Sequence, residues 1–467
     1  MKSVYLQMKN LITAKPVIVW SIWVFFLIGL SQVSIRVQLP FQKNNTIGIE
    51  LTTAFLLLTM LVFGLRYYRL VAKRIIALRK WLVIIIGLLV VLGAYFTIVT
   101  YVRAHTGYSV KSSWVMLYEI AVAVTLYWFA RVARIPLKSI IWAAAIFLVI
   151  VNASLFVNML KGDDIRTSSI LGNINVYIAL VLLSMAPILY ELRTGSTRAL
   201  VARSVAGLFL LTSSLLFLVL SGSRFAIWAM LIQLIILCVY LRKYVKRSDI
   251  FILGMSVILL LCALVPVYHI STAARQNIYR AMYYPAKVVG VDSSADTDLV
   301  STQFNTAFIH PIELGQHILN NEVVPNQPTE DRRLLTRSWI YQEAFTGFMQ
   351  NPWLGSGSHL IYFEGWGEQS SHNYLVDILL TFGLIGGSIF IVIIAFPIWA
   401  LLLAMAHKKI RIVSILGIAS VMLFSMVEPI LTDKMLIILL VWLICAGGLY
   451  DGAYRENNTV NALERTQ

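Results

Sequence analysis

The sequence predicts an all-α membrane protein with about twelve transmembrane helices and one large extracytoplasmic loop between helices nine and ten. Hydrophobic residues make up 59% of the 467 residues and charged residues only 13%. The mean hydropathy is +0.79. Such a composition is typical of polytopic membrane proteins. Long apolar runs recur along the chain, and basic residues alternate between the loops that join them.

Twelve runs are apolar over roughly the length that crosses a bilayer. They lack the period-two alternation of barrel strands, so we expect helices. The first run is long and no small-residue cleavage site follows it, which favours a retained helix over a signal peptide. The expected helices are 17–35, 47–65, 82–102, 114–130, 140–157, 170–190, 205–220, 225–241, 251–268, 374–403, 412–427 and 435–449.

The distribution of basic residues predicts the orientation of these helices. With a cytoplasmic N-terminus, 24 of the 38 Lys and Arg fall on the inner side and 8 on the short outer loops. The long loop holds 6 against 10 acidic residues. This is the positive-inside pattern, so the net charge of +16 encodes topology and not nucleic-acid binding. Both termini are expected in the cytoplasm.

The chain therefore divides into helices one to nine (1–270), the outer loop (271–372), and helices ten to twelve with a short tail (373–467). A loop of this length is where function is expected. Within it, 332–350 has the spacing of an amphipathic helix that rests on the bilayer or on the bundle. Pro352 should end that helix, and Gly355 and Gly357 should turn the chain back.

The sequence gives no indication of a metal or cofactor site. All three cysteines fall inside expected helices, where they are most simply packing residues. Asp296-Thr297-Asp298 resembles a metal-binding motif of nucleotide-sugar enzymes, but no nucleotide-binding domain accompanies it. We interpret it as solvated loop.

A titratable histidine stands where the long loop meets the tenth apolar run. His372 and Asn373 follow Ser370 and Ser371, which can cap a helix. A helix N-terminus disfavours the imidazolium, so a neutral ring there can accept a proton. A structural capping role is the alternative. Six of the seven histidines fall on the predicted outer side, where most are ordinary loop residues.

Arginines on the same side indicate an anionic ligand. Arg224 begins the helix expected at 225–241, where the helix dipole disfavours a cation unless an anion is near. Phosphate suits an arginine fork beside free helix amides, and an equal alternative is an arginine that extends to lipid headgroups or pairs with an acid. Arg337 heads the amphipathic segment, and Arg275 and Arg280 follow the ninth helix.

These residues lie in motifs that resemble the O-antigen ligase and O-antigen polymerase superfamily of bacterial membrane glycosyltransferases. The strongest are RSWIYQEAFTGFMQNPWLGSG, headed by Arg337, and HNYLVDILLTFGLIGG, which begins at His372. LSGSRFAIWAML carries Arg224, DIRTSSILGNINVYIALV carries Arg166, and Glu428 is a fainter match. The similarity covers roughly 158–449. The family fold has twelve helices with a large loop between the ninth and tenth.

The resemblance implies an inverting, metal-independent glycosyltransferase without a cofactor. Its donor would be an undecaprenyl-diphosphate-linked glycan on the outer face of the bacterial cytoplasmic membrane. His372 would be the general base, and Arg224 and Arg337 would hold the diphosphate. The other expected contacts to the diphosphate or the glycan are Arg166, Arg275, Arg280, Asn373 and Asp377.

The acceptor stays open at this level. A polymerase adds repeat units to a lipid-linked chain, whereas a ligase moves the finished chain to lipid A-core. We favour the polymerase because the middle of the loop lacks a basic cluster for a phosphorylated acceptor. A chain-length regulator is then a further expected partner. O-linked protein glycosylation differs only in acceptor, and a non-enzymatic transporter of the same glycan would need charges near the mid-bilayer and related halves.

Overall fold

The structure is a computed structural model and describes most of the apolar runs and the end of the long loop. The described residues are 16–30, 34–38, 46–66, 83–95, 97–99, 111–161, 171, 173–194, 200–221, 223–240, 254–256, 258–265, 337–357, 360–363, 367–371, 373–403, 409–426 and 437–449. Residues 271–336, the larger part of the predicted outer loop, lie outside this set.

Each of the twelve predicted runs contains a helical stretch. The labelled helices are α2 (Pro16–Leu30), α3 (Leu51–Arg66), α5 (Lys111–Ala133), α6 (Leu137–Leu160), α7 (Ile174–Thr194), α8 (Leu200–Leu220), α9 (Arg224–Tyr240), α14 (Arg337–Gln350), α15 (Tyr374–Leu403) and α16 (Lys409–Ser425). Further helical stretches occupy Val83–Val99, Gly254–Val265 and Ile437–Leu449. Among the described helices, α6, α7 and α15 are long and apolar enough to cross a membrane. The helical fold class is therefore confirmed, and the count of twelve crossings stays a prediction.

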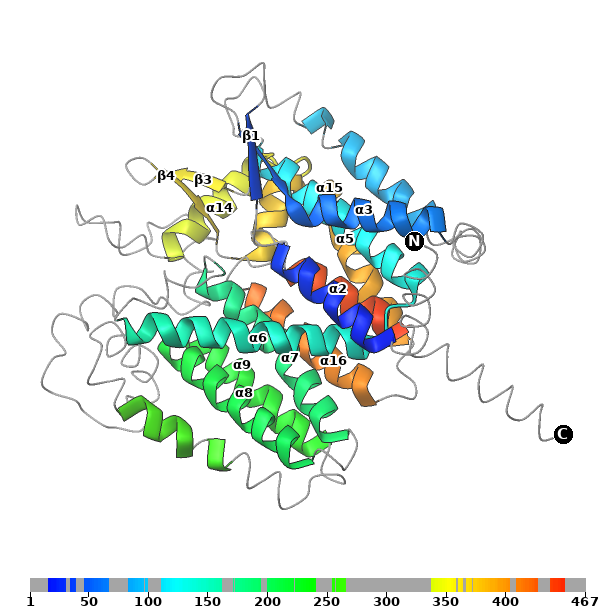
Figure 1. Ribbon diagram of the computed structural model, residues 1–467. Coiled ribbons are helices and arrows are strands. Elements are labelled where there is room, and N and C mark those ends of the chain that lie inside the picture. Colours follow the sequence, from blue (N-terminus) through cyan, green and yellow to red (C-terminus); the bar gives the residue numbers. More distant parts are fainter. Residues whose placement is uncertain are drawn as a thin grey trace, which may run out of the picture.

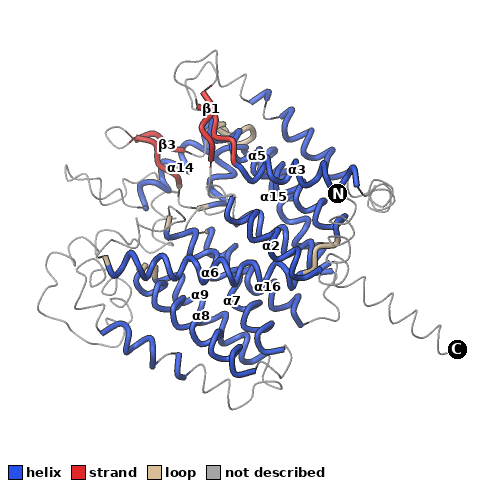
Figure 2. Tube along the Cα trace, in the orientation of Figure 1, coloured by secondary structure: helices blue, strands red, loops and turns tan. Residues whose placement is uncertain are grey.

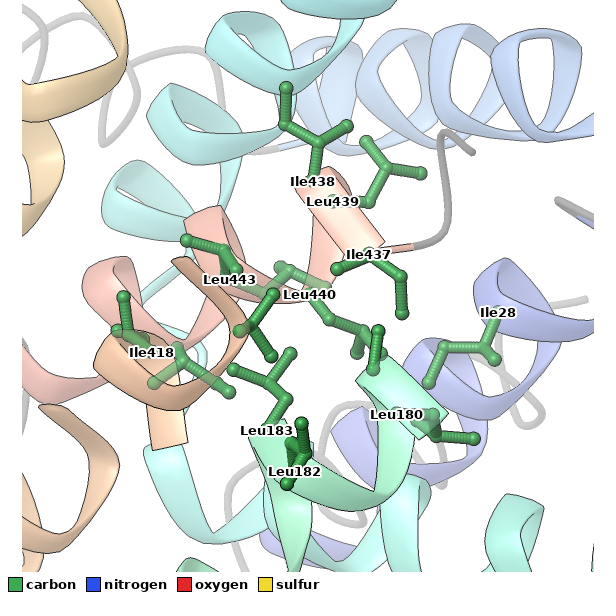
Figure 3. Packing of buried hydrophobic residues seen from close by; sticks show 14 of the residues in the cluster. Ile28, Leu180, Leu182, Leu183, Ile418, Ile437, Ile438, Leu439, Leu440 and Leu443 are labelled. Carbon is green, nitrogen blue, oxygen red and sulfur yellow. The ribbon is translucent and has the colours of Figure 1, made fainter. Parts of the chain in front are cut away.

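Helix α7 is the centre of the bundle. It contacts α6, α8, α9 and α16, and its side chains from Val176 to Leu183 are fully buried. Figure 3 shows Leu180, Leu182 and Leu183 of α7 in one cluster with Ile28 of α2, Ile418 of α16 and residues of the helix at Ile437–Leu449. In Figure 1 helices α6 to α9 lie side by side, with α2, α3 and α5 on the other side of α6. Helix α7 is thus the packed centre of the described bundle.

The closest packing in the core joins α7 to α16. A Cβ atom added at Gly417 would lie 2.3 Å from the carbonyl oxygen of Leu183. Pro187 lies four residues further along α7, and because proline has no N–H it cannot bond to that carbonyl. Gln233 of α9 donates from Nε2 to the neighbouring carbonyl of Leu182 at 2.7 Å. Small residues and interhelical hydrogen bonds are the usual means of helix association in membranes.

Two short hairpins are the described strands. Strand β1 (Ser34–Gln38) pairs antiparallel with β2 (Thr46–Glu50), and β3 (Leu360–Phe363) pairs with β4 (Gly367–Ser370). Both lie at the periphery of the helical body (Figure 2). The predicted helices at 17–35 and 47–65 were therefore wrong at 34–35 and 47–50. Ile35, Val37, Ile47 and Ile49 alternate with polar or small residues, and this strand pattern continues directly into the helical apolar runs.

Candidate functional site

The tenth predicted helix is broken, contrary to the single span expected at 374–403. Gly383 of α15 has φ 63° and ψ −166°, outside the helical region. The ring centroids of Tyr374 and Phe390 are 6.5 Å apart. In a straight helix, residues sixteen apart are separated by about 24 Å along the axis. Helix α15 therefore folds back at Gly383 into a first part, 374–382, and a second part, 384–403.

A turn from the end of the long loop fills this break. The first part leaves carbonyls without helical partners, and Ser356 N and Gly357 N donate to those of Leu380 (2.7 Å) and Thr381 (3.0 Å). The first N–H groups of the second part also have no helical partners, and Leu384 N donates to Pro352 O at 2.8 Å. Backbone groups inside a membrane protein need such partners. The turn 351–357 is thus an integral part of α15.

Glycines make this contact possible. Gly355 has φ +72°, and a Cβ there would lie 2.5 Å from Gly383 N. A Cβ at Gly383 would lie 2.4 Å from Trp353 O. Only glycine combines a positive φ with so close an approach of two backbones. The predicted turn residues Gly355 and Gly357 are confirmed at positive φ, whereas the partner Gly383 was not predicted.

A tyrosine from the third apolar run also contacts the residues at the break. Tyr95 donates its hydroxyl to Phe382 O at 2.9 Å and lies 3.2 Å from Trp353 O. A Cβ at Gly386 would lie 2.4 Å from Cε1 of the Tyr95 ring. Residues 95, 353 and 382 are far apart in the sequence, so no local pattern indicated this joint.

Helix α14 packs on the first part of α15. Its residues Ile340 and Ala344 are buried, and a Cβ at Gly347 would lie 3.2 Å from Leu380 Cδ1. The helix predicted at 332–350 is found over Arg337–Gln350, and it ends just before Pro352, as expected. Helix α14 contacts the bundle through the side that carries Ile340 and Ala344. In Figure 1 α14 and the β3–β4 hairpin lie together at one edge of the molecule.

Asn373 caps the first part of α15. Its Oδ1 accepts from the N–H groups of Leu375 (3.0 Å) and Val376 (3.1 Å). Its Nδ2 donates to the carbonyl oxygen of Met426, at the end of α16, at 2.9 Å. Ser370 belongs to β4, so the helix cap is Asn373 and not one of the two serines considered from sequence. The cap ties the start of α15 to the end of α16.

Asp377 holds the residue before His372. It is fully buried, and its Oδ1 accepts from Ser371 Oγ at 2.6 Å and from Ser371 N at 3.1 Å. Its own N–H donates to Asn373 O at 2.9 Å. The carboxylate thus fixes residue 371, and the backbone N–H of Asp377 bonds to residue 373, so the residues on either side of position 372 are both held.

The start of α9 reaches the same end of α16. Ser223 caps α9, accepting from Ala226 N at 3.4 Å, and Arg224 is the first residue of the helix. The Phe225 ring stacks on Phe424 with centroids 5.9 Å apart and planes inclined by 27°. Phe424 is two residues before Met426, the acceptor of the Asn373 amide. The start of α9, at Arg224, and the start of α15, at Asn373, therefore flank one helix end.

Three of the other predicted site residues lie outside the described residues, as does His372 itself. They are Arg166, Arg275 and Arg280.

Arg337 is the first residue of α14, at the end remote from the break. The first part of α15 also has its C-terminal end at the break. The N-terminal ends of α14 and α15, at Arg337 and Tyr374, therefore both point away from the break. In the described part of the chain, no three His, Cys, Asp or Glu side chains gather as metal ligands.

These features define a helical membrane protein in which α14 packs on a broken helix, α15, and the starts of α9 and α15 meet at the end of α16. Residues 206–391 match the model of the O-antigen ligase family. This part of the chain, from α8 to the second part of α15, is therefore similar to the O-antigen ligase family, and the match supports the O-antigen ligase and O-antigen polymerase superfamily. The resemblance drawn from the motifs is thereby confirmed. No curated protein matches the chain.

Proposed function

We propose that the protein is an inverting glycosyltransferase that uses an undecaprenyl-diphosphate-linked glycan on the outer face of the bacterial cytoplasmic membrane. The family supports a membrane glycosyltransferase of ligase or polymerase type, with a lipid-linked glycan and an acceptor as substrates. The observation that carries the site is the meeting of two helix starts at the end of α16. Asn373 bonds to Met426 and Phe225 stacks on Phe424.

The proposed reaction needs one base and a cationic cradle. His372 takes the proton of the acceptor hydroxyl, and the oxygen forms a bond to the anomeric carbon of the donor. The bond from that carbon to the diphosphate breaks, and undecaprenyl diphosphate leaves with the electron pair. Attack opposite the leaving group inverts the anomeric centre. Arg224 and Arg337 neutralise the leaving diphosphate, the role that a metal ion has in other transferases.

The described contacts refine the roles of two residues. Both ends of the Asn373 amide and one oxygen of Asp377 are engaged within the protein. We therefore assign Asn373 and Asp377 to positioning His372 and not to binding the glycan. Arg166, Arg275 and Arg280 remain proposed contacts to the diphosphate or the glycan.

The acceptor distinguishes the candidate reactions. We propose a polymerase of surface-polysaccharide repeat units, because the loop middle lacks a basic cluster. Purified protein in nanodiscs should lengthen undecaprenyl-diphosphate repeat units in the presence of a chelator. Transfer only to lipid A-core would replace the polymerase by a ligase. Glycan movement across the bilayer without a new glycosidic bond on any acceptor would refute the enzyme and favour a transporter.

A further inference from the structure

The turn that fills the break in α15 carries large apolar side chains outward. Trp353 is 64% exposed and Leu354 is 38% exposed. The backbone of the same turn is firmly held, because Pro352 O and Trp353 O accept from Leu384 N (2.8 Å) and Ile385 N (3.3 Å). The exposure of these side chains is thus a fixed feature of the fold.

This exposed surface continues onto the second part of α15. Leu384 and Ile385, the first residues after the break, are 39% and 46% exposed. The second part has 20 residues, or about 30 Å of helix, enough to cross a hydrocarbon core alone. Its other exposed large apolar side chains are Ile391, Val392, Trp399, Leu402 and Leu403. We call Trp353, Leu354, Leu384 and Ile385 the turn patch.

We infer that the turn patch lies in the membrane interface, with bilayer lipids at the boundary of headgroups and acyl chains as its partner. An indole is most stable at this depth, where its ring is in hydrocarbon and its N–H is hydrated. An exposed apolar surface continuous with a candidate span has lipid as its natural neighbour. This inference does not depend on the proposed reaction.

Helix α14 extends the same surface. Phe345 and Met349 lie one turn apart on α14 and are 42% and 56% exposed, whereas Ile340 and Ala344 are buried on the other side. An apolar face turned away from the bundle is expected for a helix that also touches lipid. The end of the long loop is then anchored at a defined depth, together with the starts of α14 and α15.

The inference is tested by measuring the depth of a label at Trp353. Cys238 and Cys262, which are exposed, are replaced by Ala, and buried Cys445 is kept. Trp353→Cys is labelled with an environment-sensitive fluorophore and placed in nanodiscs of phosphatidylcholine and phosphatidylglycerol. We expect lipids with a nitroxide near the top of the acyl chain to quench this label several-fold more than aqueous iodide does. The substitution keeps the backbone carbonyl that bonds to Ile385, so the break stays filled.

Gln350→Cys is the matched control, because this exposed residue lies at the end of α14 and outside the turn patch. Its label should be quenched mainly by iodide. Leu354→Cys provides a second labelled position in the turn patch, with the same expectation as Trp353→Cys. The inference is overturned if the labels at 353 and 354 respond to iodide as the control does. It is equally overturned if both quenchers fail, since the patch would then be covered by protein.

Discussion

At the scale of single residues, Asn373 has two separable functions. Its oxygen caps α15, and its amide nitrogen holds Met426 of α16. Asn373→Ala removes both and should lower the free energy of unfolding by about 1 kcal/mol from the lost cap alone. Asn373→Asp keeps a capping oxygen but has no hydrogen to donate to Met426. We expect it to retain the melting temperature while losing most of the transfer rate. If Asn373→Asp transfers glycan at the wild-type rate, the hydrogen bond from residue 373 to Met426 is not needed for transfer.

Gly383 is the residue at which α15 breaks, and any side chain there meets the turn backbone. Gly383→Ala places a Cβ 2.4 Å from Trp353 O at a positive φ. The expected loss is about 3 kcal/mol, from strain and overlap together. Gly87→Ala is the matched control, because nothing lies within 4 Å of its added Cβ. The check is the melting temperature of both variants in detergent. Equal melting temperatures would show that the break is not required for stability.

At the scale of elements, the joint at the break depends on a helix distant in sequence. Tyr95→Phe keeps the ring against Gly386 and removes the hydroxyl that bonds to Phe382 O. We expect a loss of about 1 kcal/mol and faster proteolysis between α14 and α15, because the turn 351–357 leaves the break more often. Proteolysis rates in nanodiscs measure this directly. If Tyr95→Phe resists proteolysis as well as the wild type does, the backbone bonds of the turn 351–357 hold it in the break without the Tyr95 hydroxyl.

The contact of α7 with α16 fixes the position of α16, at whose end the starts of α9 and α15 meet. Gly417→Ala would place a Cβ 2.3 Å from a backbone oxygen of α7, which cannot move without shifting the helix. Gly448→Ala is the control, because its Cβ would lie 2.6 Å from Leu401 Cδ1, the end of a flexible side chain. We expect Gly417→Ala to lower the melting temperature clearly more than Gly448→Ala. The reverse order would contradict the central position of α7 and α16.

At the scale of the whole molecule, hydropathy predicted where helices form because a run of apolar residues is a local property. It did not predict the break at Gly383, because that break is completed by residues 351–357, which lie earlier in the chain. Residues 34–35 and 47–50 of the two strands were predicted as helix because their apolar residues adjoin the helical apolar runs in the sequence. The start of α15 was recognised as a candidate site, but Ser371, Asn373 and Asp377 are all residues that cap helices. Only the geometry assigns the cap to Asn373.

The proposed glycosyl transfer takes place where α9 and α15 meet at the end of α16. Its most direct test is the initial rate of glycan transfer in nanodiscs by His372→Ala, compared with His310→Ala, a histidine of the same loop read as ordinary. Loss of a general base predicts a rate lower by about 100-fold or more for His372→Ala. His310→Ala should keep the wild-type rate, and both variants should keep the wild-type melting temperature. Wild-type transfer by His372→Ala would contradict the account.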